Sequence, residues 1–155
     1  MTEADAGPPK RILVVDDEPV LRDLTSGALK RAGYHVDSAK DGAEAWEILQ
    51  QHGYDLLVTD YNMPRLTGVE LIKNLRAAGI RLPAILVTGS YPADEFSCHP
   101  WPQPEATLFK PVTFAELFET VGTVLCAHAL RRSETDGGPI LPIAGAGAEI
   151  RSFQP

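Results

Sequence analysis

Acidic side chains stand at the ends of two apolar segments in this sequence. Asp16 and Asp17 follow the branched apolar run at residues 11–15, and Asp60 closes the run that begins at Leu56. Short continuous apolar runs are typical of parallel strands that are covered on both faces. An open α/β sheet presents its reactive groups at the carboxyl ends of its strands. We therefore expect these three carboxylates to meet at one edge of a sheet.

Two further polar groups follow apolar runs in the same way. Thr88 ends the run at 84–88, and Lys110 follows the short run at 107–109. Three crowded carboxylates repel one another, and their pKa values rise unless a cation relieves the conflict. Mg²⁺ prefers octahedral oxygen ligands and keeps several waters, so a few carboxylates and a backbone carbonyl suffice to bind it. The residue types predict a Mg²⁺ site with a hydroxyl and an ammonium group nearby.

The intervening segments predict the helices that must position these groups. Four amphipathic helices are expected. The first runs from Pro19 to Gly33, and its apolar face consists of Leu21, Leu24, Ala28 and Ala32. The second runs from Asp41 to about His52, and the third from Thr67 to about Gly79. The last runs from Thr113 to about Arg132, with Phe114 on its apolar stripe. A second, weaker strand is expected at 35–39. Alternating strands and helices imply a mostly parallel five-stranded sheet with helices on both faces. We predict a doubly wound α/β fold with the strand order 2-1-3-4-5.

The segment from Gly89 to Glu105 breaks this alternation. It carries Pro92, Pro100, Pro102 and Pro104, which cannot all lie inside one ordinary helix. We expect an irregular Pro-rich segment with at most a turn or two near residues 93–96. Residues 1–9 are expected to form a flexible leader, 10–132 one domain, and 133–155 a C-terminal tail.

Composition excludes several broad classes of protein. The 155 residues include 23% charged residues, and the formal net charge is −7. A general nucleic-acid binder or an anionic-membrane binder is rich in clustered Lys and Arg, so neither is expected. We find no apolar run long enough to span a bilayer and no signal-peptide pattern. Cys98 and Cys126 form no CxxC motif or disulfide framework, and we expect a cytoplasmic location.

Taken in order, these motifs resemble the receiver domain of two-component response regulators. The resemblance rests on Asp16-Asp17, Asp60 with Pro64 and Gly68, Thr88-Gly89, and Lys110-Pro111, and it covers residues 10–132. It implies a flavodoxin-like fold and a cis bond at Lys110-Pro111. By this resemblance, Asp17, Asp60 and the backbone carbonyl of Asn62 would bind Mg²⁺ directly, and Asp16 would act partly through water.

The resemblance also implies a function. Asp60 would be the phosphoacceptor that attacks a phosphohistidine, while Lys110 and Thr88 stabilise the transferred group. The partners would be a histidine kinase or a histidine phosphotransfer protein and an unknown downstream protein, with no direct contact to nucleic acid or membrane. We expect a stand-alone receiver that is not an enzyme beyond its own phosphorylation and dephosphorylation.

Two features depart from the family, and other functions stay open. Thr107 stands where receivers carry a switch aromatic, three residues before the lysine, and the prolines fall in the switch helix. We expect an intact acceptor site, but an unusual surface where the phosphorylated domain would bind its downstream partner.

A receiver-like interaction scaffold that is never phosphorylated is the main alternative. A small Mg²⁺-dependent phosphatase would want a second carboxylate where Asn62 stands, and a mononucleotide binder would want a Gly-rich loop after the first strand.

Overall fold

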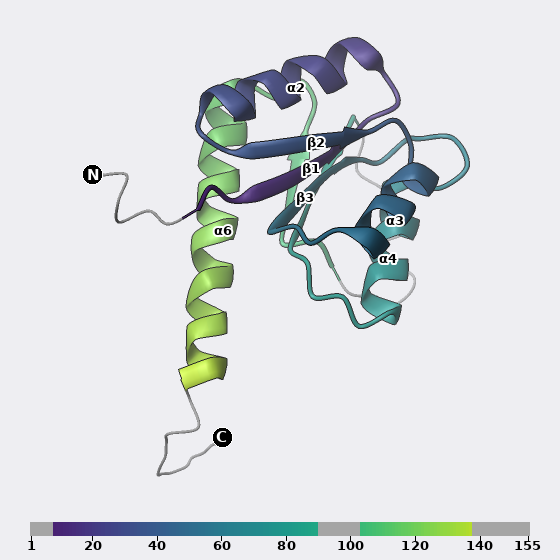
Figure 1. Ribbon diagram of the computed structural model, residues 1–155. Coiled ribbons are helices and arrows are strands. Elements are labelled where there is room, and N and C mark those ends of the chain that lie inside the picture. Colours follow the sequence, from purple (N-terminus) through teal and green to yellow (C-terminus); the bar gives the residue numbers. More distant parts are fainter. Residues whose placement is uncertain (1–7, 90–102, 138–155) are drawn as a thin grey trace.

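The computed structural model describes residues 8–89 and 103–137, and it shows a parallel sheet with helices on both faces (Figure 1). The strand order is β2-β1-β3-β4-β5, as the sequence predicts. The strands are β1 (Arg11–Val15), β2 (His35–Ala39), β3 (Leu56–Asp60), β4 (Ala84–Thr88) and β5 (Ala106–Phe109). The helices are α2 (Pro19–Arg31), α3 (Gly42–Gln51), α4 (Gly68–Ala77) and α6 (Phe114–Gly137).

The central strands are apolar on both faces, and this pattern produces two separate cores. Leu13 and Val15 of β1 face a core that includes residues of α3 and α4. Ile12 and Val14, which point to the other face, pack in a core that includes residues of α2 and α6. Successive side chains of a strand alternate between the two faces of a sheet. The continuous apolar runs of the sequence are therefore explained by burial on both sides.

Local signals at the helix ends agree with the predicted boundaries. The Asp41 side chain accepts a hydrogen bond from the backbone N–H of Glu44 at 2.8 Å and caps α3. Thr67 and Glu70 form a reciprocal capping box at the start of α4. Gly33 has a φ of 104° just beyond α2, a left-handed conformation that glycine adopts without steric cost.

Several details of the predicted helices are wrong. Leu24 of α2 is 50% exposed and Ala32, just after the helix, is exposed as well, while Ser26, Ala28 and Leu29 are the buried residues of that helix. The buried face is turned away from Leu24, which spacing alone had placed with the apolar residues. Phe114 is 46% exposed although it lies on the same helical face as Leu117 and Val121, because it stands in the first turn of α6, at the rim of the sheet. Helix α6 also continues past Arg132 to Gly137, since no glycine or proline interrupts it before that point.

Some expectations fall outside the described residues. They concern the leader apart from its last two residues, the turn at 93–96 with most of the Pro-rich segment, and the part of the tail after Gly137. The predicted domain boundaries therefore stay predictions. In the parts of the chain that are described, none of the helices has the length and apolar character needed to span a bilayer.

The strand register aligns the functional ends of the sheet. Val15 of β1 is opposite Thr59 of β3, and Asp60 is opposite Val87 of β4. The residues that follow β1 therefore lie beside Asp60, and the end of β4 lies on its other side. The start of α4 is held close to the same point. The N–H of Gly68 donates to the carbonyl of Tyr61 at 3.0 Å, and a Cβ on Gly68 would lie 2.3 Å from the carbonyl oxygen of Asp60.

Replacing Gly68 with alanine is expected to destabilise the fold because the new Cβ cannot fit against the Asp60 backbone. Overpacking of this kind costs about 1–3 kcal/mol. Equilibrium urea unfolding of Gly68→Ala should show this loss. Gly53→Ala is the matched control, since a Cβ at Gly53 meets nothing within 4 Å. Equal stability of Gly68→Ala and wild type would contradict the close approach of α4 to Asp60.

Candidate functional site

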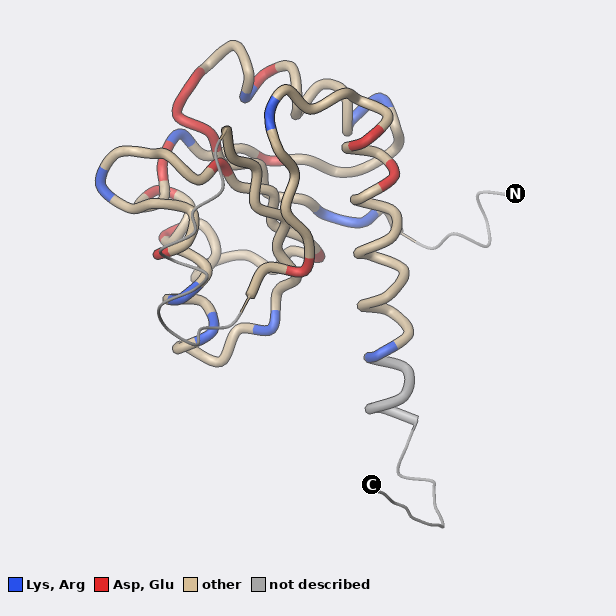
Figure 2. The backbone as a smooth tube through the Cα atoms, turned by 180° about the vertical axis from the view of Figure 1, so that it is seen from behind, with Lys and Arg blue, Asp and Glu red and all other residues tan. Residues whose placement is uncertain are grey.

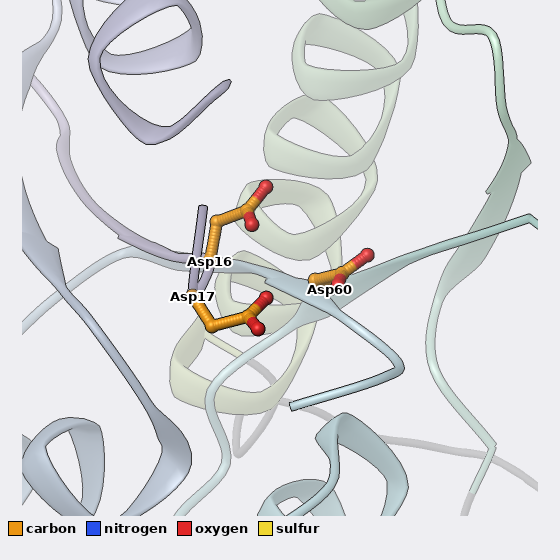
Figure 3. A group of neighbouring side chains, drawn as sticks. All are labelled: Asp16, Asp17 and Asp60. Atoms are coloured by element: carbon orange, nitrogen blue, oxygen red, sulfur yellow. The ribbon is translucent and has the colours of Figure 1, made fainter. Parts of the chain in front are cut away.

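Three carboxylates gather at the carboxyl edge of the sheet. Asp16 and Asp17 follow β1, and Asp60 is the last residue of β3. Each offers an oxygen, and the three oxygens lie within 4.8 Å of one another. Figure 3 shows the side chains of Asp16 and Asp17 extending to the side on which Asp60 lies. Asp16 and Asp60 are buried, whereas Asp17 is exposed to solvent.

Burial and mutual repulsion make the ionised state of this cluster costly. Burial is the main cause that raises the pKa of Asp16, and the charge of Asp60 adds to the effect. Burial also raises the pKa of Asp60, with a further contribution from Asp17, although Lys110 opposes the increase. Both shifts are those expected when carboxylates share a partly dry site without a cation.

Lys110 lies on the other side of Asp60 and forms a direct ion pair with it. The Lys110 Nζ is 2.8 Å from Asp60 Oδ1. Burial lowers the pKa of Lys110, but the hydrogen bond to Asp60 and the nearby acidic charges outweigh it, so the pKa of Lys110 is raised overall. The ammonium group therefore stays charged at neutral pH. The Lys110–Pro111 bond is cis, as the resemblance implied.

The two remaining predicted site residues occupy the same rim. Thr88 is buried at the end of β4, and its carbonyl accepts a hydrogen bond from the Lys110 N–H at 2.8 Å. Thr88 and Lys110 are thus held in fixed relation by the sheet ladder. Asn62 is exposed in the loop after β3, two residues beyond Asp60. Its carbonyl stays a predicted ligand.

Two residues that sequence reasoning did not single out position Asp16. The backbone N–H of Glu18 donates to Asp16 Oδ1 at 2.9 Å. Arg22, one turn into α2, donates from Nη1 to the carbonyl of Asp16 at 2.9 Å. These contacts hold the acidic loop against α2. The signal in the sequence is weak, because an arginine in a first helical turn is usually solvated.

The donor set fits a small divalent cation. Carboxylate oxygens are hard ligands, and Mg²⁺ needs only one or two of them beside its waters. The exposed side chain of Asp17 leaves the cluster open to solvent on one side. Burial and neighbouring carboxylates raise the pKa of Asp16 and of Asp60, so a bound cation would favour their ionised forms. The residues that could hold the ion are Asp16, Asp17 and Asp60.

Comparison with known proteins places this geometry in a family. The sequence profile of the response regulator receiver domain matches residues 12–122. The chain belongs to this family. Its acidic residues occupy the carboxyl edge of the sheet, where receiver domains bind Mg²⁺ in an acidic pocket.

Curated relatives of this receiver domain include kinases as well as response regulators. The chain is 35% identical over 118 residues to the sensor histidine kinase RcsC of Salmonella typhi, a match that covers 76% of the chain and 12% of that protein. It is 34% identical over 134 residues to the response regulator MprA of Mycobacterium sp. (strain KMS), a match that covers 86% of the chain and 56% of MprA. The chain therefore spans about half of one relative and about an eighth of the other.

Solved structures of receiver domains have the same fold. The response regulator protein TrrA from Thermotoga maritima, solved in complex with Mg²⁺-BeF, is 35% identical with a TM-score of 0.66. That match covers 74% of this chain and 98% of TrrA. The fold class predicted from the sequence is confirmed.

The electrostatic cost of the cluster predicts how cations and pH affect stability. In Mg²⁺-free buffer at pH 7, Asp16→Asn should unfold at higher urea than wild type, by about 1 kcal/mol, because a buried charge is removed while its hydrogen bond with Glu18 can persist. The folded-state pKa of Asp16 is raised, so the folded state binds the proton more tightly. Wild type should therefore gain stability relative to the variant as pH falls through that pKa.

Adding Mg²⁺ should reverse the order at pH 7. A ligand at ten times its Kd stabilises the folded state by about 1.4 kcal/mol, and the variant lacks one of the carboxylates that hold it. Asp23→Asn, an exposed position on α2, is the matched control and should respond to Mg²⁺ as wild type does. An equal response of wild type and Asp16→Asn to Mg²⁺ would show that Asp16 has no part in cation binding.

Proposed function

We propose that this receiver domain accepts a phosphoryl group from a phosphohistidine onto Asp60 and uses the modified state to change its binding to a partner protein. The contact that best supports this proposal is the ion pair of 2.8 Å between Lys110 Nζ and Asp60 Oδ1, directly beside the acidic cluster. A carboxylate between a cation-binding cluster and a fixed ammonium group is arranged for transfer of an anionic group. A purely structural ion pair would not need two further carboxylates within 4.8 Å.

Each residue of the site has a separate role in the proposed reaction. An Asp60 carboxylate oxygen attacks the phosphorus, the P–O bond forms, and the P–N bond to the histidine breaks with its electron pair staying on the imidazole. Lys110 neutralises charge on the phosphoryl oxygens, and the Thr88 hydroxyl donates a hydrogen bond to one of them. Mg²⁺ bound by Asp16, Asp17, Asp60 and the Asn62 carbonyl would supply further charge neutralisation. Positioning and charge, rather than acid–base catalysis, carry this reaction.

The phosphodonor would be a histidine kinase or a histidine phosphotransfer protein. We expect no other substrate, since the chain would catalyse only its own phosphorylation and dephosphorylation. Asn62 stands where a phosphatase of similar design would carry its second carboxylate, which supports this interpretation. Cys126 is a free thiol, in keeping with the reducing cytoplasm that we propose as its location. The stand-alone organisation stays a prediction.

Phosphorylation of Asp60 can be tested directly with acetyl phosphate as the donor. In the presence of Mg²⁺, wild type should gain the mass of one phosphoryl group, and Asp60→Asn should gain none. Intact-protein mass spectrometry measures both. Asp23→Asn should be labelled like wild type, because Asp23 is exposed and is not part of the carboxylate cluster. If no donor labels wild type, the receiver-like scaffold becomes the better interpretation.

Residues 103–108 should change less on phosphorylation than the corresponding residues of other receivers. Thr107 occupies the position at which the family carries its switch aromatic, and it pairs with Leu86 between β5 and β4. Phe109 is 49% exposed. We therefore expect beryllofluoride with Mg²⁺ to shift the amide resonances of Asp16, Asp17, Asp60 and Lys110 while residues 103–108 change little. Heteronuclear NMR spectra of wild type and Asp60→Asn, which should not respond, measure this. A wide change over residues 103–110 would show an ordinary switch.

A further inference from the structure

Helix α6 is too long for the sheet that it covers. Its 24 residues span about 36 Å, whereas a five-residue strand spans about 17 Å. Leu117, Val121 and Val124 are buried against the sheet, but none of the residues from 125 to 131 is buried. Figure 1 shows the C-terminal half of α6 extending beyond the sheet. Helices in proteins are stabilised mainly by packing. Leu125 packs against the core as a partly buried residue, and the described residues of α6 beyond it belong to neither core.

The face of α6 that points away from the sheet is apolar. Phe118 is 37% exposed and Leu130 is 62% exposed. A wide, open groove lies between these two side chains, and it is lined by Glu119 and by the small residues Gly122, Thr123, Cys126 and Ala127. The large side chains at the two ends and the small ones between them would admit another helix at close range.

Charge is distributed along α6 in a way that identifies the occupant of this groove. Glu116 and Glu119 lie near the start of the helix, no Asp, Glu, Lys or Arg occurs from 120 to 130, and Arg131 and Arg132 follow, ahead of Glu134 and Asp136 at the very end. Figure 2 shows red, then a long tan stretch, then blue along the described part of the helix. Over residues 116–132 a helix with the reverse order of charges would be complementary, and an antiparallel copy of the same segment has that order.

We propose that the outer face of α6, from Phe118 to Leu130, binds the same face of a second copy of this chain in antiparallel orientation. A two-fold axis near residues 124 and 125 places Phe118 and Glu119 of one copy beside Leu130 and Arg131 of the other. The small residues then meet at the crossing point. The contact is isologous, so it closes as a dimer.

Gly122 supports a close approach at this crossing. Glycine weakens a helix interior, and a Cβ at Gly122 would meet nothing within 4 Å of its own chain. Packing within the chain therefore does not require glycine there. A second helix crossing at this position gains from the missing side chain. One helix pair buries little surface, so the dimer is expected to be in the weak, micromolar range.

Sedimentation velocity of the full chain over a range of micromolar concentrations tests the proposal. Wild type should sediment as a dimer that dissociates on dilution. Leu130→Glu should weaken dimerisation at least about tenfold, since it places a charge in the apolar contact. Leu24→Glu is the matched control, because Leu24 is also an exposed leucine but lies on α2. Thermal unfolding and acetyl phosphate labelling check that both variants remain folded.

Charge reversal tests the orientation of the two copies. Glu119→Arg alone and Arg131→Glu alone should each weaken the dimer, because each places like charges together, and the double variant should restore it. A monomeric wild type, or a dimer that Leu130→Glu leaves unchanged, would overturn the proposed surface. Failure of the double variant to restore a dimer weakened by both single changes would overturn the antiparallel arrangement.

Discussion

Repulsion between carboxylates at the carboxyl edge of the sheet is the constraint on which the site depends. Asp16 and Asp60 are buried and lie together with Asp17, so their ionised forms are stable only with compensating positive charge. Lys110 supplies part of it through its contact with Asp60 Oδ1. A proton or a divalent cation can relieve the rest, and the cluster has the oxygen ligands that Mg²⁺ prefers. The fold tolerates the cost because two apolar cores secure the strands that carry these residues.

The backbone around Asp60 keeps that arrangement from relaxing. Asp60 ends β3, and the Tyr61 N–H that follows it donates to the carbonyl of Val87 on β4. Gly68 brings the start of α4 against the Asp60 carbonyl, where no side chain would fit. The glycine of the sequence motif is thus a packing requirement of the strand that carries Asp60. Repelling side chains held on so fixed a backbone cannot separate far without disturbing the sheet.

The sequence predicts the parts of the structure that follow from local and periodic rules. The central strands β1, β3 and β4 were predictable because each is a short apolar run, and Asp16, Asp17 and Asp60 could be placed together because parallel strands end at one edge. The exposed Leu24 could not be predicted, since spacing defines an apolar stripe only to within one neighbouring position. The role of Arg22 depends on the path of the loop after β1, which no periodicity encodes. The length of α6 was underestimated because its apolar periodicity stops near residue 130, whereas the helix continues to the glycine at 137.

The position of α6 has a mechanical consequence. The helix starts at Phe114, four residues after Lys110, and its other end is about 36 Å away. Its first turns are anchored in the core, while its last turns project past the sheet. A tilt of a few degrees about the anchored turns would move the far end by about 2–3 Å. A small reorientation of the chain beside Lys110 would therefore be measurable at a distance from the acidic cluster.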